Sequence, residues 1–140
     1  MEAAEIPSMP SQLNPAGRSP FIAKAPQFYA GAAGTGAPVH VHGDAWNALA
    51  HGRKRWVLFP PEQARYSTIP AGEFYGAVLP ELCRECAEHP GAHCPLQVTQ
   101  EEGDILFVPR EWGHAVLNVQ PSVGVAAEFD SVWSRSGDMQ

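Results

Sequence analysis

Long apolar runs, an excess of basic charge and a full set of paired cysteines are all missing from this sequence. No apolar stretch approaches the roughly 20 residues that a membrane-spanning helix needs. Nine Lys and Arg against fifteen Asp and Glu give a formal net charge of −6, which argues against an electrostatic grip on a nucleic-acid backbone. Three cysteines are an odd number and do not make a disulfide framework. We therefore expect no membrane partner and disfavour nucleic acid as a partner.

The start of the chain also lacks the features of a secretory signal. Residues 1–6 are acidic and have neither the basic start nor the apolar stretch of such a signal, so an intracellular location is favoured. Residues 1–20 hold four prolines among Ser, Gly and Ala, which predicts a flexible lead-in. The length of 140 residues suits one domain, expected over 21–132 with a tail over 133–140.

What the sequence does contain is two groups of short, strand-like segments, most of them separated by Gly-rich or Pro-rich turns. The first group comprises residues 26–30, 37–42, 45–50 and 53–59. The second group comprises residues 96–100, 104–108, 113–119 and 122–129. Eight short strands are the number that a jelly roll needs, so the sequence predicts an all-β double-stranded β-helix. Such a barrel could expose an edge strand, and forming a homodimer is one way to cover that edge.

An insert over about residues 60–95 separates the two groups of strands. Within it, Pro80–Glu88 predicts a short helix that Pro90 and Gly91 would end. The insert carries five side chains of the types that bind zinc, namely Cys83, Cys86, His89, His93 and Cys94. Zinc sites usually space their ligand pairs by about a dozen residues or more. Free thiols are therefore the leading interpretation, and a zinc site or a disulfide such as Cys86–Cys94 stays open.

Three histidines are the most informative residues in the chain. His40 and His42 are two residues apart in one strand-like segment, and alternate residues of a strand point to the same face. His114, in a distant segment, can close a site around them. Imidazole suits iron, zinc, copper and nickel. A single such histidine is more often an ordinary core residue, but three at these spacings predict a metal site.

Both histidine segments belong to patterns that begin with a glycine. In the first pattern, five residues separate Gly34 from His40-x-His42. In the second, Gly103 is followed after five residues by Pro109, after four more by His114 and after three more by Asn118. The glycines turn the chain into each strand, and the strands aim the histidines into the barrel. These patterns resemble the two motifs of the cupin superfamily, with Glu111 where the second motif usually has glycine.

The longer segments around these patterns resemble a narrower family, the JmjC-domain 2-oxoglutarate oxygenases. They are Gly34–His42, Trp46–Leu49 with Gly52–Pro61, and Glu102–His114. The resemblance runs from about Phe28 to Phe129. It is strongest to the small JmjC-only branch and is most like the JmjC-domain-containing protein 8 group.

This resemblance implies an Fe(II) site with 2-oxoglutarate as co-substrate. His40 and His114 match the two histidine ligands of the family, whereas His42 stands where the family has a carboxylate. Without that carboxylate, the net charge of the metal-loaded site is more positive by one unit, which changes the redox properties of the metal. Asp44 is an alternative ligand to His42, although the strand would have to bend through Gly43 to bring it in.

Two further residues match the co-substrate pocket of the family. Lys54 matches the lysine that pairs with the far carboxylate of 2-oxoglutarate, and Asn47 matches a polar residue that lines the same pocket. On a strand, Lys54 would share a face with Trp56, so its ammonium would lie beside apolar walls and need an anion as partner. Ala126 stands where relatives often have a hydroxyl residue near this carboxylate.

The leading interpretation is an Fe(II)- and 2-oxoglutarate-dependent oxygenase, of hydroxylase or demethylase type, that acts on a protein or similar macromolecular substrate. The alternative is a non-catalytic JmjC-like module for metal binding or interaction, which His42 and Ala126 favour and Lys54 opposes. A three-histidine cupin dioxygenase that acts on a small molecule is the third interpretation.

Aromatic side chains recur beside the strands that carry these motifs. They are Phe28, Tyr29, Trp46, Trp56 and Trp112. Because aromatic residues dominate protein cores, we expect most of them inside the barrel. The mouth of the pocket is the alternative place for Tyr29.

Overall fold

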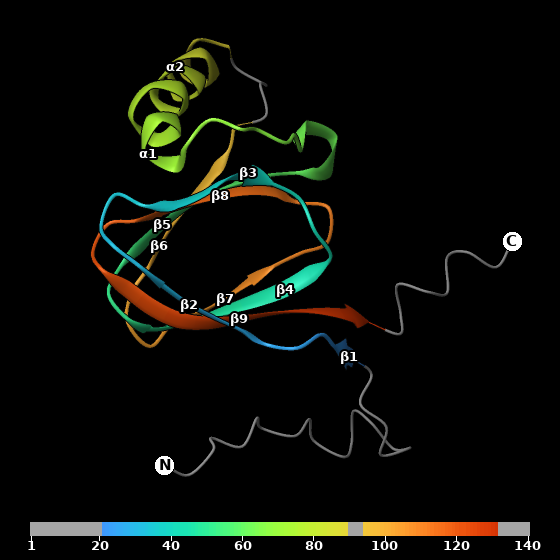
Figure 1. The fold of residues 1–140 in the computed structure, drawn as a ribbon. Helices are drawn as coiled ribbons and strands as arrows, with labels where there is room; N and C mark the ends of the chain where they lie inside the picture. Colours follow the sequence, from blue (N-terminus) through green and yellow to red (C-terminus); the bar gives the residue numbers. More distant parts are fainter. Residues whose placement is uncertain (1–20, 90–93, 132–140) are drawn as a thin grey trace, which may run out of the picture.

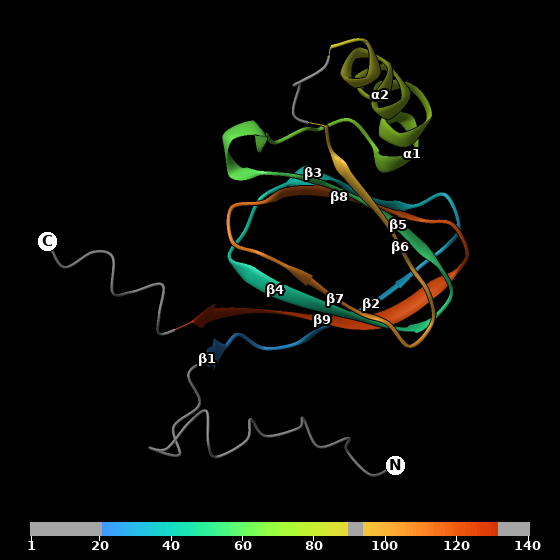
Figure 2. The same cartoon turned by 180° about the vertical axis from the view of Figure 1, so that it is seen from behind.

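The computed structural model describes residues 21–89 and 94–131, so the expected lead-in over 1–20 and tail over 133–140 lie outside the described residues. Two antiparallel β-sheets face each other (Figure 1). The helices lie on the outer side of the four-stranded sheet, away from the five-stranded sheet, and the view from behind agrees (Figure 2). Within the described ranges, no helix combines the length and the apolar character needed to cross a membrane.

The five-stranded sheet has the order β1-β9-β4-β7, and β2 also pairs with β9. Its strands are β1 (Phe21–Ala23), β2 (Gln27–Gly31), β4 (Asp44–His51), β7 (Ile105–Val108) and β9 (Ser122–Ser131). The four-stranded sheet has the order β3-β8-β5-β6. Its strands are β3 (Gly36–His40), β5 (Lys54–Phe59), β6 (Leu96–Gln100) and β8 (Gly113–Asn118).

The chain passes repeatedly from one sheet to the other, as a double-stranded β-helix requires. Strands β3, β4 and β5 alternate between the two sheets, and so do β6, β7, β8 and β9. All eight predicted strands are present with small shifts at their ends, and the short β1 is an addition. The all-β jelly-roll prediction is confirmed.

Strand β5 shows how the local sequence directs side chains into this fold. Its first three residues alternate, so that Lys54 and Trp56 are buried and Arg55 is exposed. Val57 follows and is fully buried although it points to the opposite face from Trp56. Both faces of the four-stranded sheet are therefore covered, one by the barrel interior and the other by the helical insert.

The insert is more helical than the sequence predicted. It contains η1 (Pro61–Gln63), α1 (Ala71–Glu73), η2 (Phe74–Val78) and α2 (Leu79–Glu88). The predicted helix over Pro80–Glu88 is present as α2, but the continuous helical stretch that contains it already begins at Ala71. The extra turns bury Phe74 and Tyr75 against the sheet, and the Tyr75 hydroxyl lies 2.8 Å from the Arg55 carbonyl oxygen. This packing outweighs the weak helix propensity of the glycines in these turns.

The cysteines of the insert differ from the leading expectation. Cys86, near the end of α2, forms a disulfide with Cys94, just before β6, and their Cα atoms are 5.6 Å apart. The expectation of free thiols is therefore wrong for Cys86 and Cys94, and of the three cysteines Cys83 alone has a free thiol. His93 lies outside the described residues, and among the described residues of the insert no cluster of zinc-type ligands is present. The reason is tertiary, because the end of the helix and the start of the strand lie together.

One expected core residue lies outside the barrel. Phe28 on β2 is 73% exposed, because the neighbouring Tyr29 takes the inward position on this short strand. Trp56 is buried in the interior, as expected. Ile105 and Phe107 on β7 are also exposed.

Candidate metal centre and the cavity beside it

His40, His42 and His114 lie together inside the barrel. One ligand atom from each lies within 4.8 Å of the others. His40 ends β3 and is paired directly with His114 on β8, which brings their ring centroids to 4.2 Å. The sequence predicted His42 on the strand, but His42 lies just beyond the end of β3. Its ring centroid is 4.5 Å from that of His114. The predicted meeting of the three imidazoles is thus present in the structure.

Hydrogen bonds to the backbone fix the outer nitrogen of each ring. The Nδ1 atoms lie near the carbonyl oxygens of neighbouring residues: His40 to Pro38 at 2.8 Å, His42 to Gly43 at 2.7 Å and His114 to Trp112 at 3.0 Å. A carbonyl oxygen only accepts, so each Nδ1 carries the proton and donates it. The Nε2 lone pairs are therefore left for a metal, and the backbone holds the rings in the tautomer that ligation needs.

Burial keeps the inner histidine uncharged. His114 is 2% exposed, and this burial lowers its pKa to about 4, with smaller contributions from the charges of His40 and His42. At neutral pH the ring is therefore neutral, and a metal ion has no proton to displace from it. Three imidazole nitrogens that converge in this way are a donor set that fits iron or another divalent transition metal.

Asp44, the alternative ligand, is not brought into this cluster. It begins β4, and its Oδ1 accepts a hydrogen bond of 2.8 Å from the backbone N–H of Arg110. This bond ties the start of β4 to the segment after β7. The carboxylate therefore has a structural partner away from the imidazoles.

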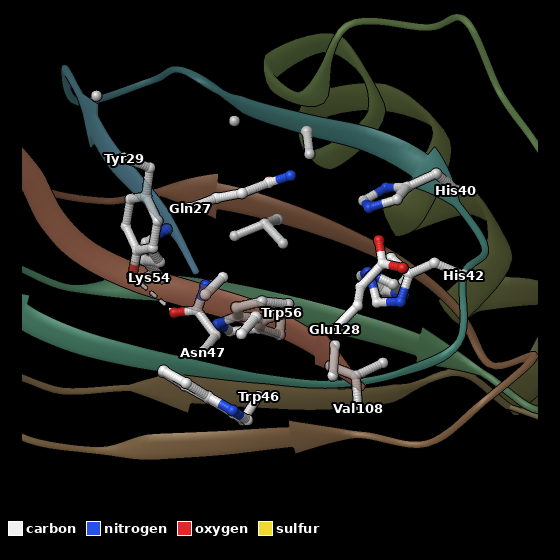
Figure 3. A pocket seen from close by; sticks show the side chains of 18 of the residues that line it. Gln27, Tyr29, His40, His42, Trp46, Asn47, Lys54, Trp56, Val108 and Glu128 are labelled. Atoms are coloured by element: carbon white, nitrogen blue, oxygen red, sulfur yellow. Dashed lines mark hydrogen bonds between the residues drawn. The ribbon is translucent and has the colours of Figure 1, made fainter. Parts of the chain in front are cut away.

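A cavity of about 410 Å³ opens beside the histidines, between the two sheets (Figure 3). This volume is within the roughly 300–1,000 Å³ range of small-molecule sites. The polar and charged side chains that line it are Lys24, Gln27, Tyr29, Thr35, His40, His42, Asn47, Lys54, His114, Asn118 and Glu128. Ala126 lines it as well. Both residues that the sequence predicted for the co-substrate, Lys54 and Asn47, therefore share one cavity with the histidines.

Lys54 is buried in the wall of this cavity without an anionic partner. It is 6% exposed, and its Nζ lies 3.6 Å from the centroid of the Tyr29 ring. Among the described residues none forms an ion pair with it. Burial lowers the pKa of Lys54 to about 8. The Tyr29 hydroxyl in turn donates a hydrogen bond of 2.7 Å to Oδ1 of Asn47. This end of the cavity offers a positive charge held over an aromatic ring.

A buried polar atom without a hydrogen-bond partner among the described residues lies in the same wall. Asn118 is the cross-strand partner of Lys54, and its Nδ2 donates to Oγ1 of Thr35 at 3.1 Å. Its Oδ1 is buried and has no hydrogen-bond partner among the described residues. A buried polar atom without a partner is costly, and such an atom commonly marks the place of a ligand or a water molecule. The wall of the cavity thus offers hydrogen-bonding groups to a polar ligand.

Some lining residues were not assigned to the site by the sequence. Tyr29 was expected mainly in the core, and Gln27 and Glu128 were not predicted at all. Tyr29 and Gln27 pair with Gly124 and Ala126 of β9, whose inward face continues to Glu128. The alternation along β9 was the available signal, because Ala126 and Glu128 are two residues apart. Gly124 leaves room for the tyrosine, since a Cβ there would lie 2.1 Å from its hydroxyl oxygen.

Comparison with known proteins gives matches that cover most of the domain. Residues 23–132 match a family model described as a cupin-like domain. The human 2-oxoglutarate and iron-dependent oxygenase JMJD4 is 36% identical over 108 residues, which cover 69% of this chain and 25% of that protein. Human JmjC domain-containing protein 8 is 35% identical over 106 residues, with coverage of 74% and 38%. The bifunctional arginine demethylase and lysyl-hydroxylase psr-1 of Caenorhabditis elegans is 30% identical over 117 residues, with coverage of 75% and 29%.

The chain therefore spans between a quarter and two-fifths of the length of these relatives. Among solved structures, the ribosomal oxygenase YcfD of Escherichia coli, in complex with cobalt and succinic acid, superposes with a TM-score of 0.51. The identity is 15%, and the match covers 78% of this chain and 24% of that one. At this identity the likeness supports the fold alone.

Proposed function

Because this chain belongs to the cupin-like domain family, as the JmjC resemblance in its sequence indicated, we propose that it is an Fe(II)- and 2-oxoglutarate-dependent oxygenase. One observation carries the proposal. The buried ammonium of Lys54 shares a cavity with the three-histidine cluster and has no anionic partner among the described residues. A buried charge without such a partner is expensive, and a dicarboxylate co-substrate would supply the partner.

The cavity supports this assignment at both of its ends. 2-Oxoglutarate carries one carboxylate beside its keto group and a second at the far end of a short chain. In the proposed binding mode Lys54 binds the far carboxylate, and the ring of Tyr29 keeps the lysine in position. The hydrogen bond from Tyr29 to Asn47 keeps that ring from turning. The keto acid end is left for the metal.

The metal would be held by His40, His42 and His114 through their Nε2 atoms. When bound, iron supplies the activation of oxygen that converts 2-oxoglutarate to succinate and CO2 and oxidises a C–H bond of the substrate. The chain itself orients the ligands and lines the reaction space. Trp56 stacks on the ring of His114 at a centroid distance of 6.0 Å. Its Nε1 donates to Gln100 at 2.8 Å, which fixes the indole as an apolar wall.

The substrate is proposed to be a protein or similar macromolecule. The names of the relatives support this class, since psr-1 is an arginine demethylase and lysyl-hydroxylase and YcfD is a ribosomal oxygenase. Hydroxylation and demethylation both begin with oxidation of a C–H bond, so the same site serves either reaction.

The test is turnover of 2-oxoglutarate by the purified protein. The chain is loaded anaerobically with Fe(II), mixed with 2-oxoglutarate and exposed to air, and succinate is quantified by NMR. We expect succinate from the wild type and none from His114→Ala or Lys54→Met. Binding of 2-oxoglutarate is measured in parallel by calorimetry with Co(II) in place of iron. A metal-bound protein that neither binds 2-oxoglutarate nor forms succinate would exclude the oxygenase.

Two specific observations favour a second function, a non-catalytic metal-binding module. His42 replaces the carboxylate that the family motif carries, and Ala126 offers no hydroxyl to a co-substrate. Such a module would bind Co(II) tightly through the three histidines and would not bind 2-oxoglutarate. The calorimetric experiment therefore distinguishes the two functions. A three-histidine dioxygenase of a small molecule would likewise bind metal without 2-oxoglutarate, but would consume oxygen with its own substrate.

A further inference from the structure

Glu128 on β9 projects into the barrel beside the histidine cluster. It pairs across the strands with Ala45, which in turn pairs with Val108, and directly opposed residues share one face of a sheet. Ala45 and Val108 are both buried in the interior. Figure 3 shows the Glu128 carboxylate directed toward the rings of His40 and His42.

This side chain is the one carboxylate among the described residues that line the cavity. Asp44 is engaged with the backbone of Arg110 and does not line it. The pKa of Glu128 is lowered, first by the hydrogen bond from Lys24 and further by the charges of His42 and His40. Glu128 is thus negatively charged at neutral pH.

The present partner of Glu128 holds it weakly. Lys24 Nζ lies 2.5 Å from Oε2 of Glu128, but the two side chains are 57% and 33% exposed. An ion pair in such contact with water changes an equilibrium constant by about fivefold or less. A divalent cation held by three imidazoles would attract the carboxylate more strongly, because the cation carries twice the charge of the ammonium and lies deeper in the barrel.

We propose that Glu128 supplies the carboxylate of this metal site. When the metal binds in the absence of 2-oxoglutarate, the Glu128 side chain leaves Lys24 and ligates the cation together with His40, His42 and His114. The loaded site thereby regains the negative charge that the family motif carries at the position of His42. The inference rests on the proposed metal site and adds a ligand from the last strand of the barrel. While it is paired with Lys24, Glu128 stays outside the cluster of ligand atoms, so rotation of its side chain is the required movement.

The experiment is titration of the metal-free protein with Co(II), followed by calorimetry and by visible absorption of the bound ion. The variants are Glu128→Gln, Lys24→Met and the double variant. Glu101→Gln is the matched control, because Glu101 also pairs with a basic residue, Arg53, but is exposed and does not line the cavity. Each titration is repeated in 0.5 M NaCl, where the Debye length is about 4 Å and long-range charge effects are screened.

We expect Glu128→Gln to weaken Co(II) binding by about tenfold or more and to change the absorption bands of the bound ion. Lys24→Met should tighten binding up to about fivefold, since it removes the competitor. A misfolded variant cannot give this gain. The double variant should behave like Glu128→Gln, and the loss should persist in high salt. An effect of Glu128→Gln below twofold, equal to that of Glu101→Gln, or abolished by salt would overturn the inference. If the wild type bound no Co(II) at all, the proposed function would fail instead.

Discussion

The ammonium of Lys54 lies 3.6 Å from the centroid of the Tyr29 ring. The contact joins β5 of one sheet to β2 of the other, across the interior of the barrel. It stabilises a charge that the fold would otherwise exclude, since cation–π contacts are worth about 0.5–2 kcal/mol. The contact does not compensate fully, because the pKa of Lys54 still lies below its usual value of 10.5. Lys54 therefore reduces stability in the empty protein, which is typical of a binding residue.

Replacing Lys54 by methionine should make the empty protein more stable. Burial lowers the pKa of Lys54 from 10.5 to about 8. Each pKa unit corresponds to about 1.4 kcal/mol, so Lys54→Met should raise the free energy of unfolding at pH 7 by about 1–3 kcal/mol. Urea denaturation measures this change. The same variant should not bind 2-oxoglutarate. Arg53→Gln is the control, since Arg53 directly precedes β5 and its side chain is exposed, and a loss of stability in Lys54→Met would contradict the argument.

Binding of 2-oxoglutarate should weaken as the pH rises through about 8. The lysine must be protonated to pair with a carboxylate, and in the empty cavity it loses its proton near this pH. Above it, affinity should fall by up to about tenfold for each pH unit. Without a ligand, Lys54 loses its proton near pH 8 in the folded protein but only near pH 10.5 in the unfolded chain. The cost of burying its charge therefore falls between these two pH values, and the stability advantage of Lys54→Met should shrink over the same range. Calorimetry between pH 6.5 and 9.5 checks the first effect, and a flat profile would contradict it.

The strands and the three histidines could be predicted because alternation along one strand is a local property. Which faces then meet inside the barrel is not local. The sequence of β2 gives no sign that Tyr29, rather than Phe28, turns inward against Lys54. The same limit explains Glu128, whose neighbours on β9 are mostly small or apolar residues, and Cys86, whose partner Cys94 lies beyond the end of its helix.

The start of the helical insert could not be predicted for a different reason. Gly72 and Gly76 lower helix propensity by about 1 kcal/mol each, so the sequence around them favours a loop. Both glycines are exposed, while Phe74 and Tyr75 between them are buried against the four-stranded sheet. Tertiary packing of the aromatic residues supplies what local propensity lacks.

Two glycines should respond to alanine with opposite signs. A Cβ on Gly36 would lie 1.9 Å from the carbonyl oxygen of Val116, so Gly36→Ala should push β3 away from β8. We expect a loss of about 2 kcal/mol or more in the free energy of unfolding. A Cβ on Gly76 meets nothing within 4 Å, so Gly76→Ala should add about 0.5–1 kcal/mol through helix propensity. Urea denaturation of both variants checks the pair, and equal effects would contradict the close approach of β3 and β8.

Metal affinity should depend on His42 although the family motif has a carboxylate there. Removal of one imidazole from three should lower Co(II) affinity by at least about 100-fold, so His42→Ala should bind the ion poorly. His51→Ala is the matched control, because His51 is exposed and paired with Glu102 at 2.9 Å, outside the cavity. Co(II) titration by calorimetry measures both variants.

His42→Asp tests whether this position is a ligand or a lining residue. The aspartate restores the motif of the family and can ligate a divalent cation, so Co(II) binding should return to within about tenfold of the wild type. An aspartate that only lined the cavity would leave the affinity as low as in His42→Ala. Wild-type affinity in His42→Ala would show that His40 and His114 hold the metal without it. Since the Nδ1 of His42 is already bonded to the carbonyl oxygen of Gly43, its Nε2 is free to ligate, and we expect the first outcome.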